Sequence, residues 1–143
     1  MIAFVIGPSC AGKSTFIKEN FPEFKKIDLY DFQTDNMSVE EVWQSYLECR
    51  DALKEAVSDN ENVVLEHTLL KRHRRDMYIE AVKDVGDFPI DIYVILPDVN
   101  TLLERRRARG IKLNSSRFLQ EEIDMCDIPI KEDGFNKIVI INN

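Results

Sequence analysis

Short apolar runs alternate along the chain with longer stretches in which apolar residues recur about every 3.6 positions. The short runs are bounded by turn residues, as is typical of buried strands, and they cover residues 2–6, 26–29, 62–65, 91–96 and 137–141. The periodic stretches predict helices over residues 13–21, 38–57, 71–85, 98–109 and 115–125. Strands that alternate with helices favour an α/β fold, with a parallel sheet covered on both faces.

The longest predicted helix has a clear beginning. Ser38 stands three residues before Glu41, which is the spacing of a capping box. The helix carries one apolar stripe, formed by Val39, Val42, Trp43, Tyr46, Leu47, Leu53, Ala56 and Val57. We therefore expect this stripe to face the core, with Trp43 either in the core or in the wall of a substrate pocket.

Composition limits the class of protein. The chain has 143 residues, of which 44% are hydrophobic and 31% charged, so a single domain over residues 1–143 is expected. No apolar run is long enough to span a membrane, and the N-terminus lacks the basic region of a signal peptide, so we expect a cytoplasmic protein. The three cysteines are widely spaced and form no CxxC pair, which predicts neither a disulfide framework nor a zinc site.

Positive charge is concentrated in one part of an acidic chain. The net charge is −7, yet eleven of the nineteen Lys and Arg residues fall between residues 71 and 117. An acidic protein repels an extended phosphate backbone, so we expect no extended nucleic-acid surface. The basic segment can still hold one compact anion, and we expect the protein to act as a monomer.

Residues 7–14 read GPSCAGKS, which is the GxxxxGKS pattern of a phosphate-binding loop, placed between a buried strand and a helix. Glycines let the backbone curl so that successive N–H groups, and the helix N-terminus, point at one phosphate. Lys13 would reach the β- and γ-phosphates of ATP, and the Ser14 hydroxyl would bind Mg²⁺. The residues predicted to bind the nucleotide here are Gly7, Ser9, Cys10, Ala11, Gly12, Lys13, Ser14 and Thr15.

Four stretches together resemble the P-loop kinases, and among them the polynucleotide 5′-kinase type of domain. They are the phosphate-binding loop, VLEHT at 64–68, LERRRAR at 103–109 and IPIKEDGF at 128–135. The resemblance implies a three-layer P-loop NTPase fold with five parallel strands in the order 2-3-1-4-5. It also implies ATP and Mg²⁺ as cofactors, a hydroxyl acceptor, and an arginine-bearing lid over about residues 105–117.

The same resemblance suggests roles for residues outside the loop. Glu66 ends a strand beside the loop strand and is expected to act with Ser14 at Mg²⁺, through a metal-bound water, or else to orient the acceptor. Asp31 is preferred over Asp28 as the general base for the acceptor hydroxyl. Arg105 and Arg109 are one helical turn apart and are expected to close over the transferring phosphoryl group.

Other basic and polar residues leave alternatives open. Arg106 and Arg117 lie close to the predicted lid arginines and are further candidates. Residues 71–75 (KRHRR) open a helix, where the helix dipole disfavours cations, so they indicate either an anionic acceptor or a solvated face. His67 is expected to be structural, and Thr68 is a weaker candidate beside Glu66.

The sequence therefore predicts a kinase with Lys13, Asp31, Arg105 and Arg109 as its catalytic residues. The acceptor would be a small molecule or a nucleic-acid end, for example the 5′-hydroxyl of a nucleoside, nucleotide or oligonucleotide. A nucleotide-binding switch with little transfer activity is one alternative. A kinase of a small metabolite or of a sugar nucleotide is another, and the choice between ATP and GTP stays open.

Overall fold

The computed structural model describes residues 1–110, 120–121 and 123–142. The strands are β1 (Ile2–Ile6), β2 (Lys25–Asp28), β3 (Val63–His67), β4 (Ile90–Ile95) and β5 (Lys137–Ile141). The α-helices are α1 (Lys13–Asn20), α2 (Val39–Asp59), α3 (Arg72–Val85) and α4 (Val99–Ala108). Two short 3₁₀ helices, η1 (Leu29–Phe32) and η2 (Lys131–Asp133), complete the described elements.

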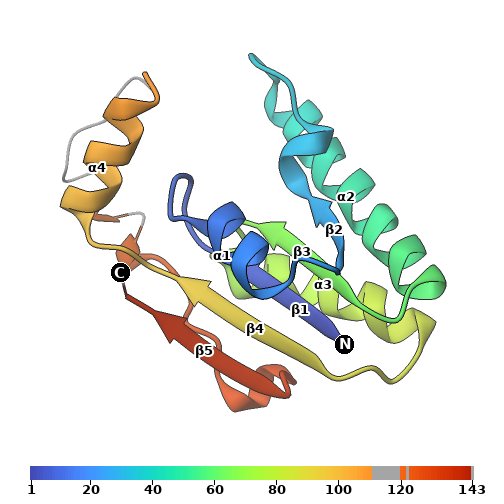
Figure 1. Cartoon of the computed structure of the whole chain (residues 1–143). Helices are drawn as coiled ribbons and strands as arrows, with labels where there is room; N and C mark the ends of the chain where they lie inside the picture. The colour runs from blue at the N-terminus through green and yellow to red at the C-terminus, as the bar shows by residue number, and fades with distance from the viewer. Residues whose placement is uncertain (111–119, 122, 143) are drawn as a thin grey trace.

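The strands form one parallel sheet in the order β2-β3-β1-β4-β5 (Figure 1). This confirms the predicted fold class and strand order. Because all five strands run the same way, the ends of β1, β3 and β4 lie beside one another, with Ile6 in register with His67 and Val94. In open parallel sheets, ligands bind at this carboxyl edge.

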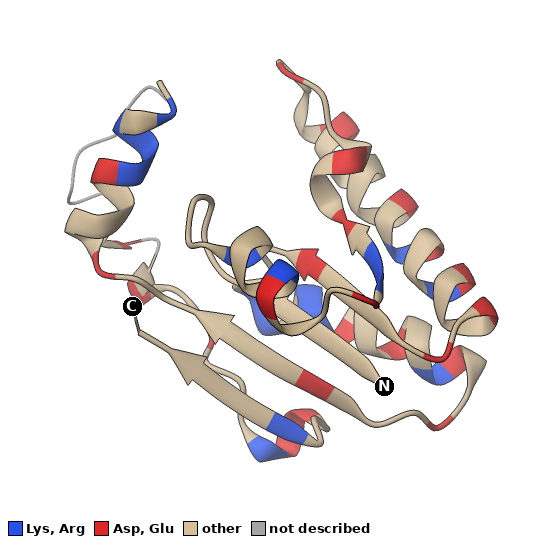
Figure 2. Cartoon of the chain, in the orientation of Figure 1, with Lys and Arg blue, Asp and Glu red and all other residues tan. Residues whose placement is uncertain are grey.

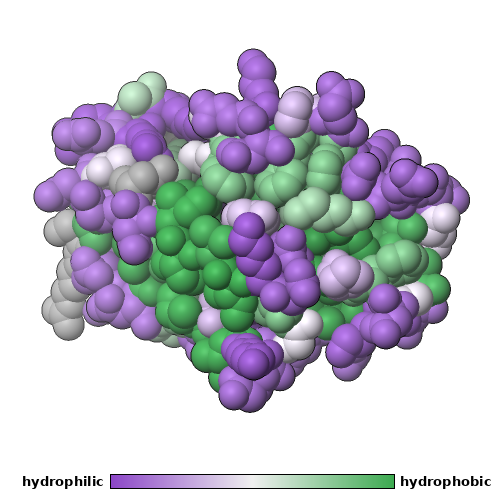
Figure 3. Space-filling model, turned by 60° about the horizontal axis from the view of Figure 1, so that its bottom comes forward, coloured by the Kyte–Doolittle hydropathy of each residue, from purple (hydrophilic) through white to green (hydrophobic). Residues whose placement is uncertain are grey.

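Helices cover both faces of the sheet, and successive residues of β1 pack alternately against the helices on one face and on the other. Ile2, Phe4 and Ile6 join a core with α2 and α3, whereas Ala3 and Val5 join a second core with α1. The edge strand β5 is only partly covered. Figure 3 shows hydrophobic residues gathered on the face that this view turns forward, with hydrophilic residues around them.

Helix boundaries agree with the sequence signals. The Ser38 Oγ accepts a hydrogen bond from the Glu41 N–H at 3.1 Å, and the Glu41 carboxylate accepts one from the Ser38 N–H at 3.1 Å, which confirms the capping box. The short helix η1 was not expected, because its four residues carry no repeated pattern.

The predicted stripe of α2 is wrong in its first two turns. Val39 is 87% exposed and Trp43 43% exposed, so Trp43 is not a core residue. The buried positions of α2 include the small residues Ser45 and Cys49 instead. The first turns extend past the ends of the strands, where there is no sheet for them to cover (Figure 1).

Two further expectations concern the remaining chain. The predicted helix over residues 115–125 lies largely outside the described residues, as do Arg117 and most of the predicted lid. Among the helices that the structure describes, none has the length and apolar character needed to cross a membrane.

Candidate active site

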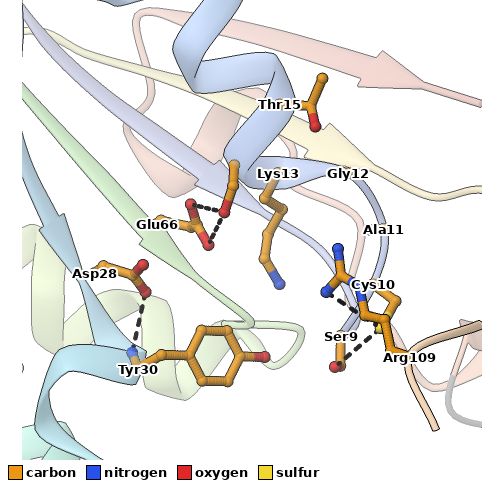
Figure 4. Close-up of a pocket in the computed structure, with 11 residues that line it drawn as sticks. Ser9, Cys10, Ala11, Gly12, Lys13, Thr15, Asp28, Tyr30, Glu66 and Arg109 are labelled. Carbon is orange, nitrogen blue, oxygen red and sulfur yellow. Dashed lines mark hydrogen bonds between the residues drawn. The ribbon is translucent and has the colours of Figure 1, made fainter. Parts of the chain in front are cut away.

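A cavity of about 260 Å³ opens at the carboxyl edge of the sheet, beside the N-terminus of α1 (Figure 4). Its wall combines the phosphate-binding loop with the ends of β2 and β3 and with one arginine from beyond α4. The lining residues are Ser9, Cys10, Ala11, Gly12, Lys13, Ser14, Thr15, Asp28, Tyr30, Glu66 and Arg109. The cavity therefore includes most of the residues that the sequence predicted to bind the nucleotide.

Two glycines allow the loop to take its shape. A Cβ atom at Gly7 would clash with the carbonyl oxygen of Ile95, because the loop turns directly against the end of β4. Gly12 has a φ of 100°, in the left-handed region that side chains disfavour, and it immediately precedes α1. Gly7 therefore shapes the loop without lining the cavity, whereas Gly12 does both.

Lys13 is the buried cation of the site, with only 4% of its surface exposed. Its Nζ donates hydrogen bonds to the carbonyl oxygens of Gly7 at 2.7 Å and Pro8 at 3.1 Å. Burial lowers the pKa of Lys13 from 10.5 to about 8, although Glu66 and Asp28 oppose this shift. A bound polyphosphate would supply the negative charge that favours the protonated lysine.

Ser14 and Glu66 form the oxygen-rich part of the cavity. The Ser14 Oγ lies 2.8 and 3.0 Å from the two carboxylate oxygens of Glu66. Figure 4 shows the Glu66 carboxylate at the wall of the cavity, with dashed lines at both of its oxygens. Glu66 is 2% exposed, and the Lys26 Nζ lies 3.1 Å from its Oε1. Glu66 is thus a buried, paired carboxylate rather than one facing solvent.

A hydroxyl beside a carboxylate suits Mg²⁺, which prefers oxygen ligands and keeps several waters and substrate phosphates around it. No group of three or more His, Cys, Asp and Glu side chains that could hold a metal occurs among the described residues. Ser14 and Glu66 therefore fit a metal that arrives with a nucleotide, and they do not fit a metal held by protein side chains alone.

The structure distinguishes the two candidate bases. Asp28 ends β2 and lines the cavity, while its Oδ1 accepts a hydrogen bond from the Tyr30 N–H at 3.0 Å and so begins η1. Asp31, on η1, is exposed and is not a lining residue. Position therefore favours Asp28 over Asp31, and the catalytic role itself stays a prediction.

Tyr30 is a site residue that sequence reasoning missed. It lines the cavity on the side of Asp28, and its ring centroid lies 5.9 Å from the Lys13 Nζ (Figure 4). The only available signal was an aromatic residue between the two aspartates, which is too common to indicate a site.

The arginines of α4 lie against the outer side of the loop. The Arg105 Nη1 donates to the carbonyl oxygens of Ala11 at 2.8 Å and Cys10 at 3.3 Å, and the Arg106 Nη2 donates to that of Ser9 at 3.3 Å. Arg109 enters the cavity, with its Nη1 at 3.6 Å from the Cys10 Sγ. Figure 2 shows that the basic residues of α4 gather toward the end of this helix.

Arg105 and Arg109 therefore stand in different places despite their helical spacing. Arg105 supports the loop backbone, whereas Arg109 is available to a ligand in the cavity. Whether either arginine contacts the transferring group stays a prediction.

His67 is a structural group. It is 1% exposed, and its Nε2 lies 2.9 Å from the Tyr78 hydroxyl, which donates in turn to the carbonyl oxygen of Tyr46 at 2.8 Å. Burial lowers the pKa of His67 to about 3, so the ring is neutral at physiological pH. This network connects β3 to both α2 and α3.

The basic cluster at residues 71–75 divides into groups with different partners. Arg75 is fully buried and donates from its Nη1 to the carbonyl oxygen of Leu69 at 3.1 Å. Asp133 lies 2.9 Å from the Arg72 Nε and 3.8 Å from the Arg75 Nη2. Lys71 donates to the carbonyl oxygen of Met125 at 2.7 Å. Neither an anionic acceptor nor a solvated face therefore accounts for the whole cluster, because Lys71, Arg72 and Arg75 bind oxygens of other parts of the chain.

The comparisons with known proteins agree with this architecture. A sequence model of the AAA domain family matches residues 2–125. No curated protein matches the chain.

Several solved structures share the fold at low identity. A sugar kinase from Janibacter sp. HTCC2649 is 13% identical, with a TM-score of 0.67, over 99% of this chain and 84% of that one. A gluconokinase from Sinorhizobium meliloti 1021 is 21% identical, with a TM-score of 0.64, over 98% and 81%. A chain of the Pnkp1/Rnl/Hen1 RNA repair complex is 18% identical, with a TM-score of 0.68, over 87% of this chain and 43% of that one.

Proposed function

The chain belongs to the AAA domain family, and from that premise we propose that it is a kinase that transfers the γ-phosphoryl group of ATP to an acceptor hydroxyl. One observation carries this proposal. A single cavity joins a phosphate-binding loop with its buried Lys13 to a carboxylate, Asp28, at the end of a neighbouring strand. The fold shared with a sugar kinase, a gluconokinase and a chain of an RNA repair complex supports the kinase over other uses of the same loop.

The donor would lie along the phosphate-binding loop. Its β- and γ-phosphates would take the place of the carbonyl oxygens as partners of Lys13, and the N–H groups of the loop and of α1 would point at the same oxygens. Arg109 would add positive charge from the other wall. Ser14 and Glu66 would hold Mg²⁺, which when bound neutralises charge on the phosphate oxygens.

The acceptor would approach from the side of Asp28 and Tyr30. Its hydroxyl oxygen forms a bond to the γ-phosphorus, the bond from that phosphorus to the β–γ bridging oxygen breaks, and ADP leaves. The Asp28 carboxylate takes the hydroxyl proton. Asp28 replaces Asp31 in this role because it lines the cavity and Asp31 does not.

A nucleotide-binding switch is the second candidate, since a phosphate-binding loop alone is enough for one. It requires no carboxylate facing the γ-phosphate from the acceptor side. The position of Asp28 in the cavity is the observation that favours the kinase.

The test is transfer of labelled γ-phosphate from ATP·Mg²⁺ to a panel of acceptors, namely 5′-hydroxyl DNA and RNA oligonucleotides, nucleosides, 3′-nucleotides, sugars and sugar acids. The Lys13→Ala variant is the blank. A labelled acceptor that is absent from the blank supports the kinase and gives its substrate class. Nucleotide binding with no labelled acceptor, and with free phosphate or no product, would favour the switch.

A further inference from the structure

One cation of the 71–75 cluster differs from its neighbours. The Arg74 guanidinium lies over two aromatic rings of α2, at 4.8 Å from the Trp43 centroid and 5.3 Å from the Tyr46 centroid. Lys71, Arg72 and Arg75 all bind carbonyl or carboxylate oxygens. Among the residues that the structure describes, no such oxygen is hydrogen-bonded to or ion-paired with Arg74.

The aromatic rings hold Arg74 in a fixed place without neutralising it. Cation–π contact orients a guanidinium and leaves its N–H groups free to bind an anion. A half-buried cation without a carboxylate partner is unusual in a chain whose net charge is −7. The position is therefore suited to an anionic group that is not part of the described chain.

Two hollows meet at Arg74. One, of about 280 Å³, is lined by Tyr46, Thr68, Leu69, Leu70, Lys71 and Arg74. The other, of about 230 Å³, is lined by Met37, Val39, Val42, Trp43, Tyr46 and Arg74. Both are below the size of a typical drug-sized pocket, so they fit a small ligand or one end of it.

The larger hollow is next to the proposed reaction centre. Thr68 follows Glu66 by two residues, which is about 7 Å along an extended chain, and Glu66 touches Ser14. Leu69, in the wall, has a φ of 37°, a left-handed conformation that is costly for leucine, and Arg75 holds its carbonyl oxygen. The loop after β3 is thus held in one shape between the reaction centre and Arg74.

Given the kinase proposed above, on which this step rests, we propose that Arg74 binds an anionic group of the acceptor. The acceptor is a small compound with a carboxylate or phosphate at one end and the reacting hydroxyl at the other. Asp28 faces the hydroxyl, and Arg74 selects for the charge. A neutral sugar of the same size leaves the guanidinium without a partner, and it therefore binds more weakly.

The protein contains a reporter for this site, because Trp43 is its only tryptophan. D-gluconate and sorbitol differ only in a carboxylate, and ribose 5-phosphate and ribose differ only in a phosphate. We expect the anionic member of at least one pair to change Trp43 fluorescence with an apparent Kd at least tenfold below that of its neutral partner. Which pair responds distinguishes a carboxylate acceptor from a phosphate acceptor.

Variants separate this site from the phosphate-binding loop. Arg74→Gln should weaken the anionic ligand at least tenfold and leave the affinity for ATP unchanged, whereas Arg74→Lys should restore part of the loss. Arg50→Gln removes the same charge from α2, where Arg50 pairs with the exposed Asp51, and should change neither affinity. Lys13→Ala should retain the fluorescence response to whichever anionic ligand the wild-type protein binds.

The outcomes for the two proposals are distinguishable. Equal binding of charged and neutral partners, no response from either pair, or a full response in Arg74→Gln would overturn the acceptor site. Phosphoryl transfer to a neutral acceptor that Arg74→Gln leaves unchanged would overturn it too, while the kinase would stand. A fluorescence response that depends on Arg74, without phosphoryl transfer to any acceptor, would support the anion site and overturn the kinase proposal.

Discussion

The proposed site has a phosphate half and an acceptor half, and they are built in different ways. The phosphate half is nearly continuous in the sequence, because residues 9–15 supply most of its wall and its geometry comes from backbone conformation. The proposed acceptor half combines side chains from separate elements. Asp28, the last residue of β2, lines the cavity itself. A separate hollow is lined by Tyr46 of α2, Thr68 after β3 and Arg74 of α3. Chemistry that depends on the backbone can be recognised as a motif, whereas chemistry that depends on side-chain placement cannot.

The cations of the two halves are also held differently. In the phosphate half, Lys13, Arg105 and Arg106 bind carbonyl oxygens of the loop itself. In the acceptor half, the buried Arg75 ties the loop after β3 to Asp133, far away in the sequence. The cations of the phosphate half thus bind backbone carbonyl oxygens, Lys13 within its own loop and the two arginines from the distant helix α4. The acceptor half instead depends on an ion pair between two distant parts of the chain.

The largest effect should come from removing the central cation of the phosphate half. Lys13→Ala should lower phosphoryl transfer by about a thousandfold or more, because no other buried lysine faces the cavity wall among the described residues. Labelled transfer and ATP binding would be measured together. Lys18→Ala, an exposed lysine of the same helix, is the control. A Lys13→Ala enzyme with near-normal turnover would contradict the assignment of the phosphate half.

The second prediction concerns the ion pair between Asp133 and the buried Arg75 of the acceptor half. Asp133→Asn leaves Arg75 buried without its carboxylate, which should cost about 3 kcal/mol of unfolding free energy. The asparagine still accepts the hydrogen bond that the Ile130 N–H donates to Asp133 at 2.9 Å, so the change is mainly one of charge. Urea unfolding measures the loss. Glu132→Gln, an exposed neighbour, should change stability little, and equal losses in the two variants would argue against the contact.

Asp28 and Asp31 test the acceptor half directly. Asp28→Asn keeps the cap on the Tyr30 N–H and removes the base, so turnover should fall about a hundredfold while ATP affinity stays the same. Asp31→Asn is the matched control and should have little effect, because Asp31 is exposed outside the cavity. Steady-state kinetics and nucleotide binding would be compared. A larger loss of turnover in Asp31→Asn than in Asp28→Asn would instead identify Asp31 as the general base.

The smallest effect is a pH dependence confined to the phosphate half. The pKa of Lys13 is about 8 in the free protein, and bound phosphates should raise it again. ATP binding at pH 9 should therefore take up close to one proton, and affinity should fall about fivefold from pH 8 to 9. Calorimetry in buffers with different ionisation enthalpies measures this uptake. Lys13→Ala should take up none, and uptake by that variant would assign the proton to another group.

Linkage gives the sign of the corresponding stability change. The unfolded chain keeps the lysine proton up to about pH 10.5, whereas the free folded protein loses it near pH 8. Because the unfolded state then binds more protons, Lys13 makes the free protein more stable as pH rises from about 8 to 10.5.

Much of the fold could be predicted from the sequence because local patterns are strong here. The strands and helices begin and end within a few residues of the predicted positions where the structure describes them, since caps, prolines and glycines mark the ends. The prediction that the apolar stripe of α2 is buried was wrong at Val39 and Trp43. Periodicity shows which residues share a helix face, but it does not show how far the sheet extends beneath that face.

The sequence by itself determined the phosphate-binding loop, its place between β1 and α1, and the parallel α/β class. These features follow from backbone preferences and from the hydrophobic period, which are properties of neighbouring residues. Only the tertiary structure placed Asp28 in the cavity, set Arg105 against the loop and placed Arg74 over the ring of Trp43. The positions of these side chains depend on which helices pack beside which strand ends. Such packing brings together residues that are far apart along the chain, and local sequence patterns do not specify it.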